Sequence, residues 1–98
     1  MIIVTGSIRA HPESLDRMLA SSLEHVRRSR LEDGCLFHSV HHDAEDRLRL
    51  VFVEHWADAD ALRAHFAVPA AQAFVREVSP LADGPPEIAV YDAQPVTV

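Results

Sequence analysis

The stretch RLRLVFVEHWADADALRAHF, residues 47–66, contains a change of periodicity that decides the fold. In its first half apolar and polar side chains alternate, which is typical of a β-strand. One face of this strand carries Leu48, Leu50, Phe52, Glu54 and Trp56. In the second half the period lengthens to about 3.6 residues, and Leu62, His65 and Phe66 fall on one side of a short helix. The stretch therefore predicts a strand ending in a carboxylate and an indole, and a helix that brings an imidazole back over them.

The rest of the chain supplies three more strands and two longer helices. The strands are predicted near residues 2–9, 35–42 and 87–92, and the helices near 12–31 and 69–81. The order strand, helix, strand, strand, helix, strand is the ferredoxin-like βαββαβ arrangement. We therefore expect a single α+β domain over residues 1–98, with a four-stranded antiparallel sheet and helices on one face. Gly6, inside the first strand, predicts a bulge or the close approach of another group.

Both faces of the predicted sheet carry apolar side chains. On the first strand, Ile2 and Val4 share one face and Ile3 lies on the other. On the third strand, Leu50 and Phe52 share one face, and Val51 and Val53 share the other. Helices cover only one face, so the open face would expose a large apolar patch. The sequence therefore predicts a homodimer formed through the open sheet face.

Composition narrows the classes of partner. The net charge is −6 and all nine basic residues are arginines, with no basic run. Nucleic acid and membrane surfaces are therefore not expected as partners. No apolar run approaches the ~20 residues of a membrane span, and the first residues lack the features of a signal peptide. Cys35 is the only cysteine, which excludes an intramolecular disulfide and suits a reducing compartment. The expected location is the cytoplasm.

Seven histidines are the most unusual feature of the composition. His38, His41 and His42 lie close together on one predicted strand, but only His38 and His42 share a face. At ~3.3 Å per residue these two lie about 13 Å apart, too far to hold one ion at Zn–N distances near ~2 Å. No metal site is predicted on this strand. His25 is expected on the exposed side of the first helix.

His65 and Glu54 are the candidates for chemistry. His65 shares a helix face with Leu62, and is either a core histidine satisfied by one hydrogen bond or a residue of a cleft. A carboxylate on the apolar face of the strand is costly to bury without a partner, and His65, Arg63 or a substrate group could supply one. Contact with Glu54 would fix the tautomer of His65, which suits a general base or a hydrogen-bond donor. Trp56 is either a stacking platform for a flat ligand or a core aromatic.

The position of His38 depends on the hairpin that joins the second and third strands. A loop with an even number of residues places His38 beside Val51 and His55. A loop with an odd number places it beside Glu54 and Trp56. The sequence leaves both registers open.

Several of these residues carry a resemblance to a known family. The segments Asp33-Gly34-Cys35-Leu36, Glu54-His55-Trp56 and Ala61-Leu62-Arg63-Ala64-His65, with Phe74, resemble the antibiotic biosynthesis monooxygenase (ABM) domain. The family pattern is approximately PGCLxY, then ExW, then ALxxH. The resemblance covers essentially the whole chain. Asp33 stands where many members have proline, and His38 stands where many have tyrosine.

The resemblance implies a dimeric α+β barrel in which two sheets face each other. It also implies a cofactor-independent monooxygenase that oxidises a small aromatic, quinol or polyketide-like substrate with O₂. The implied catalytic residues are His65, Glu54 and Trp56. The implied substrate-binding residues are Ser7, His38, Phe52, Leu62, Phe66 and Phe74.

Two alternatives remain from the sequence. Some family members degrade haem with a strand-one asparagine, a tryptophan and a histidine, and Ser7 occupies the matching position of that asparagine. A haem-binding or haem-degrading protein is therefore the first alternative. The second is a non-catalytic dimer that binds a small molecule, which is expected if Glu54 and His65 pair in a sealed core without a cavity.

Overall fold

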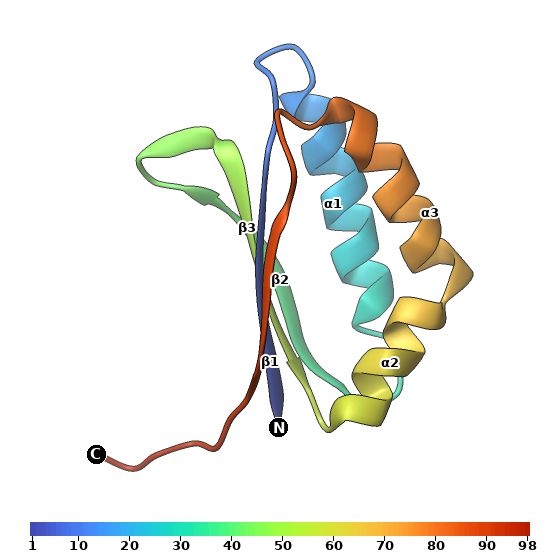
Figure 1. The fold of residues 1–98 in the computed structure, drawn as a ribbon, viewed down its shortest axis with the longest axis vertical. Helices are drawn as coiled ribbons and strands as arrows, with labels where there is room; N and C mark the ends of the chain where they lie inside the picture. Colours follow the sequence, from blue (N-terminus) through green and yellow to red (C-terminus); the bar gives the residue numbers. More distant parts are fainter.

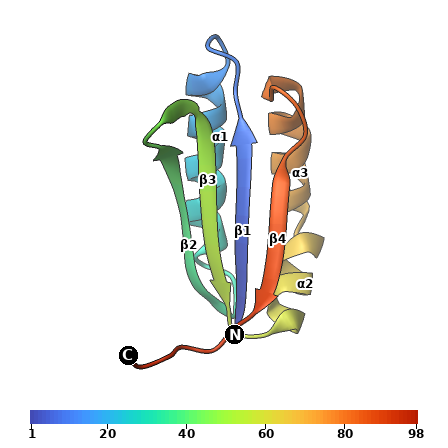
Figure 2. The same ribbon diagram turned by 60° about the vertical axis from the view of Figure 1, so that its left-hand side comes forward.

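The computed structural model describes residues 1–98 and has an α+β fold with all helices on one side of the sheet (Figure 1). The elements in chain order are β1 (Ile2–Arg9), α1 (Leu15–Ser29), β2 (Cys35–Asp43), β3 (Asp46–Trp56), α2 (Ala59–Ala67), α3 (Pro69–Val78), the 3-10 helix η1 (Ser79–Leu81) and β4 (Glu87–Asp92). The four strands are antiparallel in the order β2-β3-β1-β4 (Figure 2). The predicted ferredoxin-like fold is confirmed.

The element boundaries follow local chemistry. α1 begins at Leu15, after a turn in which the Ser14 hydroxyl accepts a hydrogen bond from the His11 amide, so the helix is shorter than the predicted 12–31. α2 begins where predicted, because the Asp58 carboxylate accepts a hydrogen bond from the Ala61 amide at 2.8 Å. The predicted helix 69–81 is α3 followed by the tighter turn η1.

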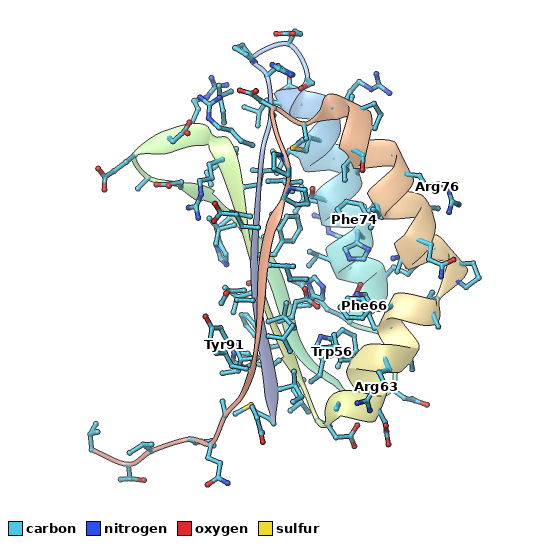
Figure 3. The ribbon with its side chains drawn as sticks, viewed as in Figure 1. Trp56, Arg63, Phe66, Phe74, Arg76 and Tyr91 are labelled. Carbon is cyan, nitrogen blue, oxygen red and sulfur yellow. The ribbon has the colours of Figure 1, made fainter.

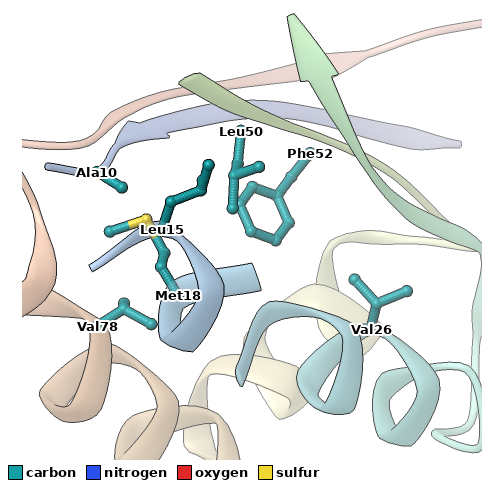
Figure 4. Packing of buried hydrophobic residues seen from close by; sticks show 7 residues of the cluster. All are labelled: Ala10, Leu15, Met18, Val26, Leu50, Phe52 and Val78. Carbon is teal, nitrogen blue, oxygen red and sulfur yellow. The ribbon is translucent and has the colours of Figure 1, made fainter. Parts of the chain in front are cut away.

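The main hydrophobic core lies between α1 and the middle of the sheet (Figure 4). Leu15, Met18 and Val26 lie on one stripe of α1, and they meet Leu50 and Phe52 of β3. Burying such side chains stabilises the fold by about 1.5–3 kcal/mol each. A smaller cluster of Val4, Trp56 and Leu62 packs α2 against the other end of the sheet.

A bulge settles the register of the β2–β3 hairpin. Asp43 pairs with Asp46 across a two-residue turn, and this pairing alone would place His38 opposite Val51. The register shifts between His42 and Asp43, so that His38 lies opposite Glu54 instead. A bulge changes which residues share a face. Here it brings an imidazole to the helix side of the sheet, next to a carboxylate.

Gly6 does not form a bulge. It pairs in regular register with Phe52 of β3 and Ile88 of β4. A Cβ atom at this position would lie 3.4 Å from the carbonyl oxygen of Glu87, its nearest neighbour. The absence of a side chain leaves space above the sheet on the helix side.

The face of the sheet away from the helices is partly apolar, as predicted. Ile3, Val51 and Val53 are half-buried on it. Tyr91 of β4 is 54% exposed and projects away from the helices (Figure 3). No helix is long and apolar enough to cross a membrane.

Candidate active site

A cavity of about 470 Å³ lies between the helices and the β1–β4 side of the sheet. It forms because α3 packs mainly against α1, α2 and η1 rather than against a strand. Phe66 and Phe74 lie between the helices and the sheet (Figure 3). Ligand sites in proteins are typically apolar cavities of about 300–1,000 Å³ with a few polar groups. The polar side chains in this wall include Glu54, His65 and His25.

Three buried histidines from three elements meet at the inner end of this cavity. They are His25 of α1, His38 of β2 and His65 of α2, and each is at most 6% exposed. Their ring centroids lie 5.3–5.9 Å apart. Glu54 of β3 lies beside two of them, His38 and His65. The cluster therefore combines three imidazoles with a buried carboxylate.

His65 is held by a carboxylate that the sequence reading did not consider. Its Nδ1 lies 2.9 Å from Oε1 of Glu32, in the turn before β2. A carboxylate only accepts, so Nδ1 carries a proton, and in the neutral ring Nε2 carries the free electron pair. Nε2 lies 4.0 Å from Oε1 of Glu54. The Trp56 ring packs against the imidazole, with centroids 4.6 Å apart. The arrangement holds the imidazole of His65 in one orientation in the cavity wall.

Glu54 is an ionised carboxylate inside the protein. Burial alone would raise its pKa, but the nearby His38, the indole of Trp56 and His65 outweigh this effect and lower the pKa below its usual value. Trp56 Nε1 donates a hydrogen bond to Oε1 at 2.9 Å. His38 Nε2 lies 3.3 Å from the same oxygen, in an orientation that leaves both nitrogens of this buried ring without a hydrogen bond.

His25 was expected to be exposed, and this prediction is wrong. The residue is buried, and its ring stacks on Phe74 with centroids 4.1 Å apart. Burial and the charges of His38, His65 and Arg28 lower its pKa to about 3, so the ring is neutral at pH 7. Arg28 donates to its Nδ1 at 2.7 Å. The spacing does contain the signal, because His25 follows Met18 by seven residues on the buried stripe of α1.

The predicted site residues divide into two groups. Those that line the cavity are Ser7, Phe52, Glu54, His65, Phe66 and Phe74. Ser7 alternates with the inward-facing residues of β1, so we assign its part of the wall to its backbone. Those that lie behind the wall are Trp56, His38 and Leu62, of which Trp56 and Leu62 pack in the small core cluster.

Comparison with known proteins places this geometry in a family. The family model for the antibiotic biosynthesis monooxygenase (ABM) domain matches residues 1–77. The chain belongs to the ABM family.

Several proteins with solved structures share this fold along nearly their whole length. A Deinococcus radiodurans protein, provisionally named an antibiotic biosynthesis monooxygenase, is 24% identical with a TM-score of 0.94, covering 100% of this chain and 97% of its own. A second structure described as an antibiotic biosynthesis monooxygenase is 28% identical with a TM-score of 0.90, covering 97% and 100%. Rv0793 from Mycobacterium tuberculosis is 21% identical with a TM-score of 0.91, covering 99% and 98%.

One curated relative is similar in sequence. An uncharacterised Synechocystis protein is 32% identical over 90 residues, which is 92% of this chain. The chain spans 61% of the length of that relative.

Glu32 and Arg28 are the residues of this ABM site that the sequence could not assign. Glu32 lies 33 positions before His65 in a polar turn, and nothing local links the two. Arg28 belongs to a group of arginines in the last turn of α1. Cations stabilise a helix at this end, so nothing in the sequence assigned Arg28 to a site. Cys35 lies near the cluster. Burial is the main cause that raises the pKa of its thiol, and the charge of Glu32 adds to it. A thiol with a raised pKa is a poor nucleophile, so Cys35 is expected to be unreactive.

Proposed function

We propose that this ABM domain is a cofactor-independent monooxygenase that oxidises a small aromatic, quinol or polyketide-like substrate with O₂. One observation carries the proposal. His65 has its Nδ1 proton bound by Glu32, its Nε2 lies 4.0 Å from Oε1 of the ionised Glu54, and both residues line an apolar cavity. This is the geometry of a general base whose protonated form is stabilised by a neighbouring carboxylate.

The reaction begins with transfer of an acidic substrate proton, from a phenol O–H or an activated C–H, to Nε2 of His65. The resulting anion gives one electron to O₂, and the substrate radical and superoxide combine to form a C–O bond. The peroxide that results takes up the proton and loses water, so the CH₂ group of a carbon acid, or the ring C–H of a quinol through its keto tautomer, becomes a carbonyl. One O₂ is consumed and one water is released, and no external reductant is needed.

Each neighbour of His65 has a separate role in this scheme. Glu54 offsets the positive charge of the imidazolium, and Glu32 keeps the proton of the resting base on Nδ1. Trp56 supports both, since it donates to Glu54 and packs against His65. Phe52, Phe66 and Phe74 supply the apolar walls that a flat substrate requires. In this proposal Trp56 supports the base and does not stack on a substrate ring.

The test is O₂ consumption by purified protein in EDTA, with anthrone or a reduced naphthoquinone as substrate. His65→Gln should lower the rate by ~10²-fold or more, the usual contribution of a general base. His42→Gln is the matched control, because His42 lies on the exposed hairpin and bonds only the Arg47 carbonyl. Unchanged turnover in His65→Gln would remove the base from the mechanism.

We also propose that the open face of the sheet joins two copies of the chain. The support is the set of half-buried apolar residues there, which no helix covers. In a dimeric α+β barrel the two sheets would face each other through this surface, and each subunit would keep its own cavity on the helix side.

Haem does not fit the residues present. Of the three residues that the haem-degrading branch would use, Ser7 directs its side chain to the open face and Trp56 is fully buried behind the cavity wall. A non-catalytic binder remains the alternative to the oxygenase. It is favoured if a flat aromatic ligand binds the cavity and no O₂ is consumed.

A further inference from the structure

Three imidazoles lie close enough to share one ion. One nitrogen from each of His25, His38 and His65 lies within 4.8 Å of the other two. Three atoms with that spacing have a common point no more than about 2.8 Å from each. A Zn–N bond is about 2.0–2.1 Å, so each ring has to move inward by less than an ångström. Rotations of side chains on three separate elements can supply such shifts.

His38 is the member of this cluster whose ring nitrogens, Nδ1 and Nε2, have no hydrogen-bond partner. Its ring is 1% exposed. A buried polar group without a partner destabilises the fold, and an ion bound to one ring nitrogen would remove part of that cost.

The surroundings supply the outer contacts that metal-binding histidines usually have. The Nδ1 proton of His65 is bound by Glu32, and such a carboxylate fixes the ring so that Nε2 faces an ion. Oε1 of Glu54 lies 3.3 Å from His38 Nε2 and 4.0 Å from His65 Nε2. This oxygen can serve as a fourth ligand or accept a hydrogen bond from a metal-bound water.

From these observations we propose that His25, His38 and His65 bind one divalent first-row transition-metal ion, with Glu54 beside it as an oxygen donor. Three imidazoles and a carboxylate suit Zn²⁺, and also Co²⁺, Ni²⁺, Cu²⁺ or Fe²⁺. The histidines weighed from sequence, His38, His41 and His42, do not form this site; the fold joins His38 to two partners from other elements.

Arg28 competes with the ion. It donates a hydrogen bond to Nδ1 of His25, and a guanidinium has only donors and a fixed positive charge. An ion can bind His25 only after Arg28 has moved away. Arg28 is half-buried at the end of α1 and has solvent to move into. Removing it should therefore strengthen metal binding.

The site also overlaps the base of the proposed oxygenase. An ion on His65 Nε2 occupies the electron pair that would accept the substrate proton. The metal-binding proposal goes beyond the oxygenase and stands without it. If both hold, Zn²⁺ inhibits turnover and EDTA restores it.

The test uses the metal-free full chain without substrate. Zn²⁺ is titrated by calorimetry, and Co²⁺ is titrated by its visible absorption, whose intensity rises when the ion becomes four-coordinate. We expect one ion per chain. His38→Ala should lower the affinity by at least ~10-fold, and Glu32→Gln by about 10–100-fold through the outer contact. His42→Ala, an exposed histidine on the same strand, should leave it unchanged.

Arg28→Gln is the variant that separates this site from adventitious binding. It should raise the affinity for Zn²⁺ at least several-fold, whereas surface histidines would not respond to it. The proposal is overturned if His38→Ala and His42→Ala lose affinity equally, or if Arg28→Gln weakens binding in a folded protein. Circular dichroism of each variant confirms folding. Because the oxygenase is assayed in EDTA and metal binding without substrate, either proposal can fail alone.

Discussion

Gly34 is a single residue on which the position of α2 depends. It adopts a positive φ of 82°, and a Cβ atom there would lie 2.5 Å from Cβ of Ala61 in α2. Its carbonyl also accepts a hydrogen bond from the Ala57 amide at 2.8 Å. The turn before β2 and the start of α2 can therefore touch only if this residue lacks a side chain.

Gly34→Ala should destabilise the protein more than Gly84→Ala. Both glycines have positive φ, which costs about 1–2 kcal/mol for an L-residue, but a Cβ at Gly84 meets nothing within 4 Å. The overlap with Ala61 should add about 1–3 kcal/mol, the usual cost of overpacking. Urea unfolding of the two variants measures the difference, and equal losses would show that α2 simply moves aside.

Glu32→Gln tests whether this carboxylate positions the catalytic base. Glutamine removes the negative charge that holds the Nδ1 proton, and when its NH₂ group faces His65 it donates to Nδ1, which moves the proton to Nε2 and removes the free electron pair. We expect kcat to fall by at least ~10²-fold with little change in KM, a loss within the usual range for acid–base groups. Nitrogen NMR of His65 should report the exchanged tautomer. A normal tautomer together with normal kcat would contradict the role.

At the scale of elements, periodicity was sufficient to predict where the strands lie. The order of the elements along the chain was sufficient to predict the topology of the sheet. β4 falls on the predicted residues 87–92, and Asp58 caps α2 as expected. The register of His38 could not be predicted, because the bulge near Asp43 depends on how the whole hairpin packs. The pairing of Glu32 with His65 is also a tertiary contact, and no local pattern encodes it.

Arg9 links β1 to β3 and to the segment after η1 at one end of the sheet. Its guanidinium donates to Asp46 at the start of β3 and to Asp83 after η1, both at 2.9 Å. The hydrogen bond and charge of Arg9 lower the pKa of Asp46 below its ordinary value near 3.8. A carboxyl group with a lowered pKa stabilises the folded state at any pH above its ordinary pKa. This stabilisation is lost as the pH falls through the pKa of the folded state.

Arg9→Gln should therefore lower the urea midpoint at neutral pH. The difference from the unmodified protein should shrink as the pH falls below about 4, and it should also shrink in ~1 M salt. Arg63→Gln is the control, because Arg63 pairs only with the exposed Asp60 within one helix. A difference that persists at low pH would assign the effect of Arg9 to packing.

At the scale of the whole molecule, association is the property to measure. Val53 lies on the open face of β3, opposite Thr5 and Ser39. Val53→Asp should convert a dimer of about 22 kDa, twice the 10.9 kDa chain, into a monomer, because a charge in an apolar interface is costly. Light scattering after size exclusion gives the mass. Leu31→Asp, at an 86% exposed residue away from the sheet, should remain dimeric. A monomeric unmodified protein would refute the dimer.

Successive residues of β3 serve opposite sides of the sheet, with Val53 on the open face and Glu54 in the cavity wall. Only the thickness of one backbone separates them. In a dimer built on this face, each cavity would lie on the outer side of its own sheet. One strand would then carry both the contact between subunits and the carboxylate of the cavity, so substitutions at alternate positions of β3 should separate association from turnover.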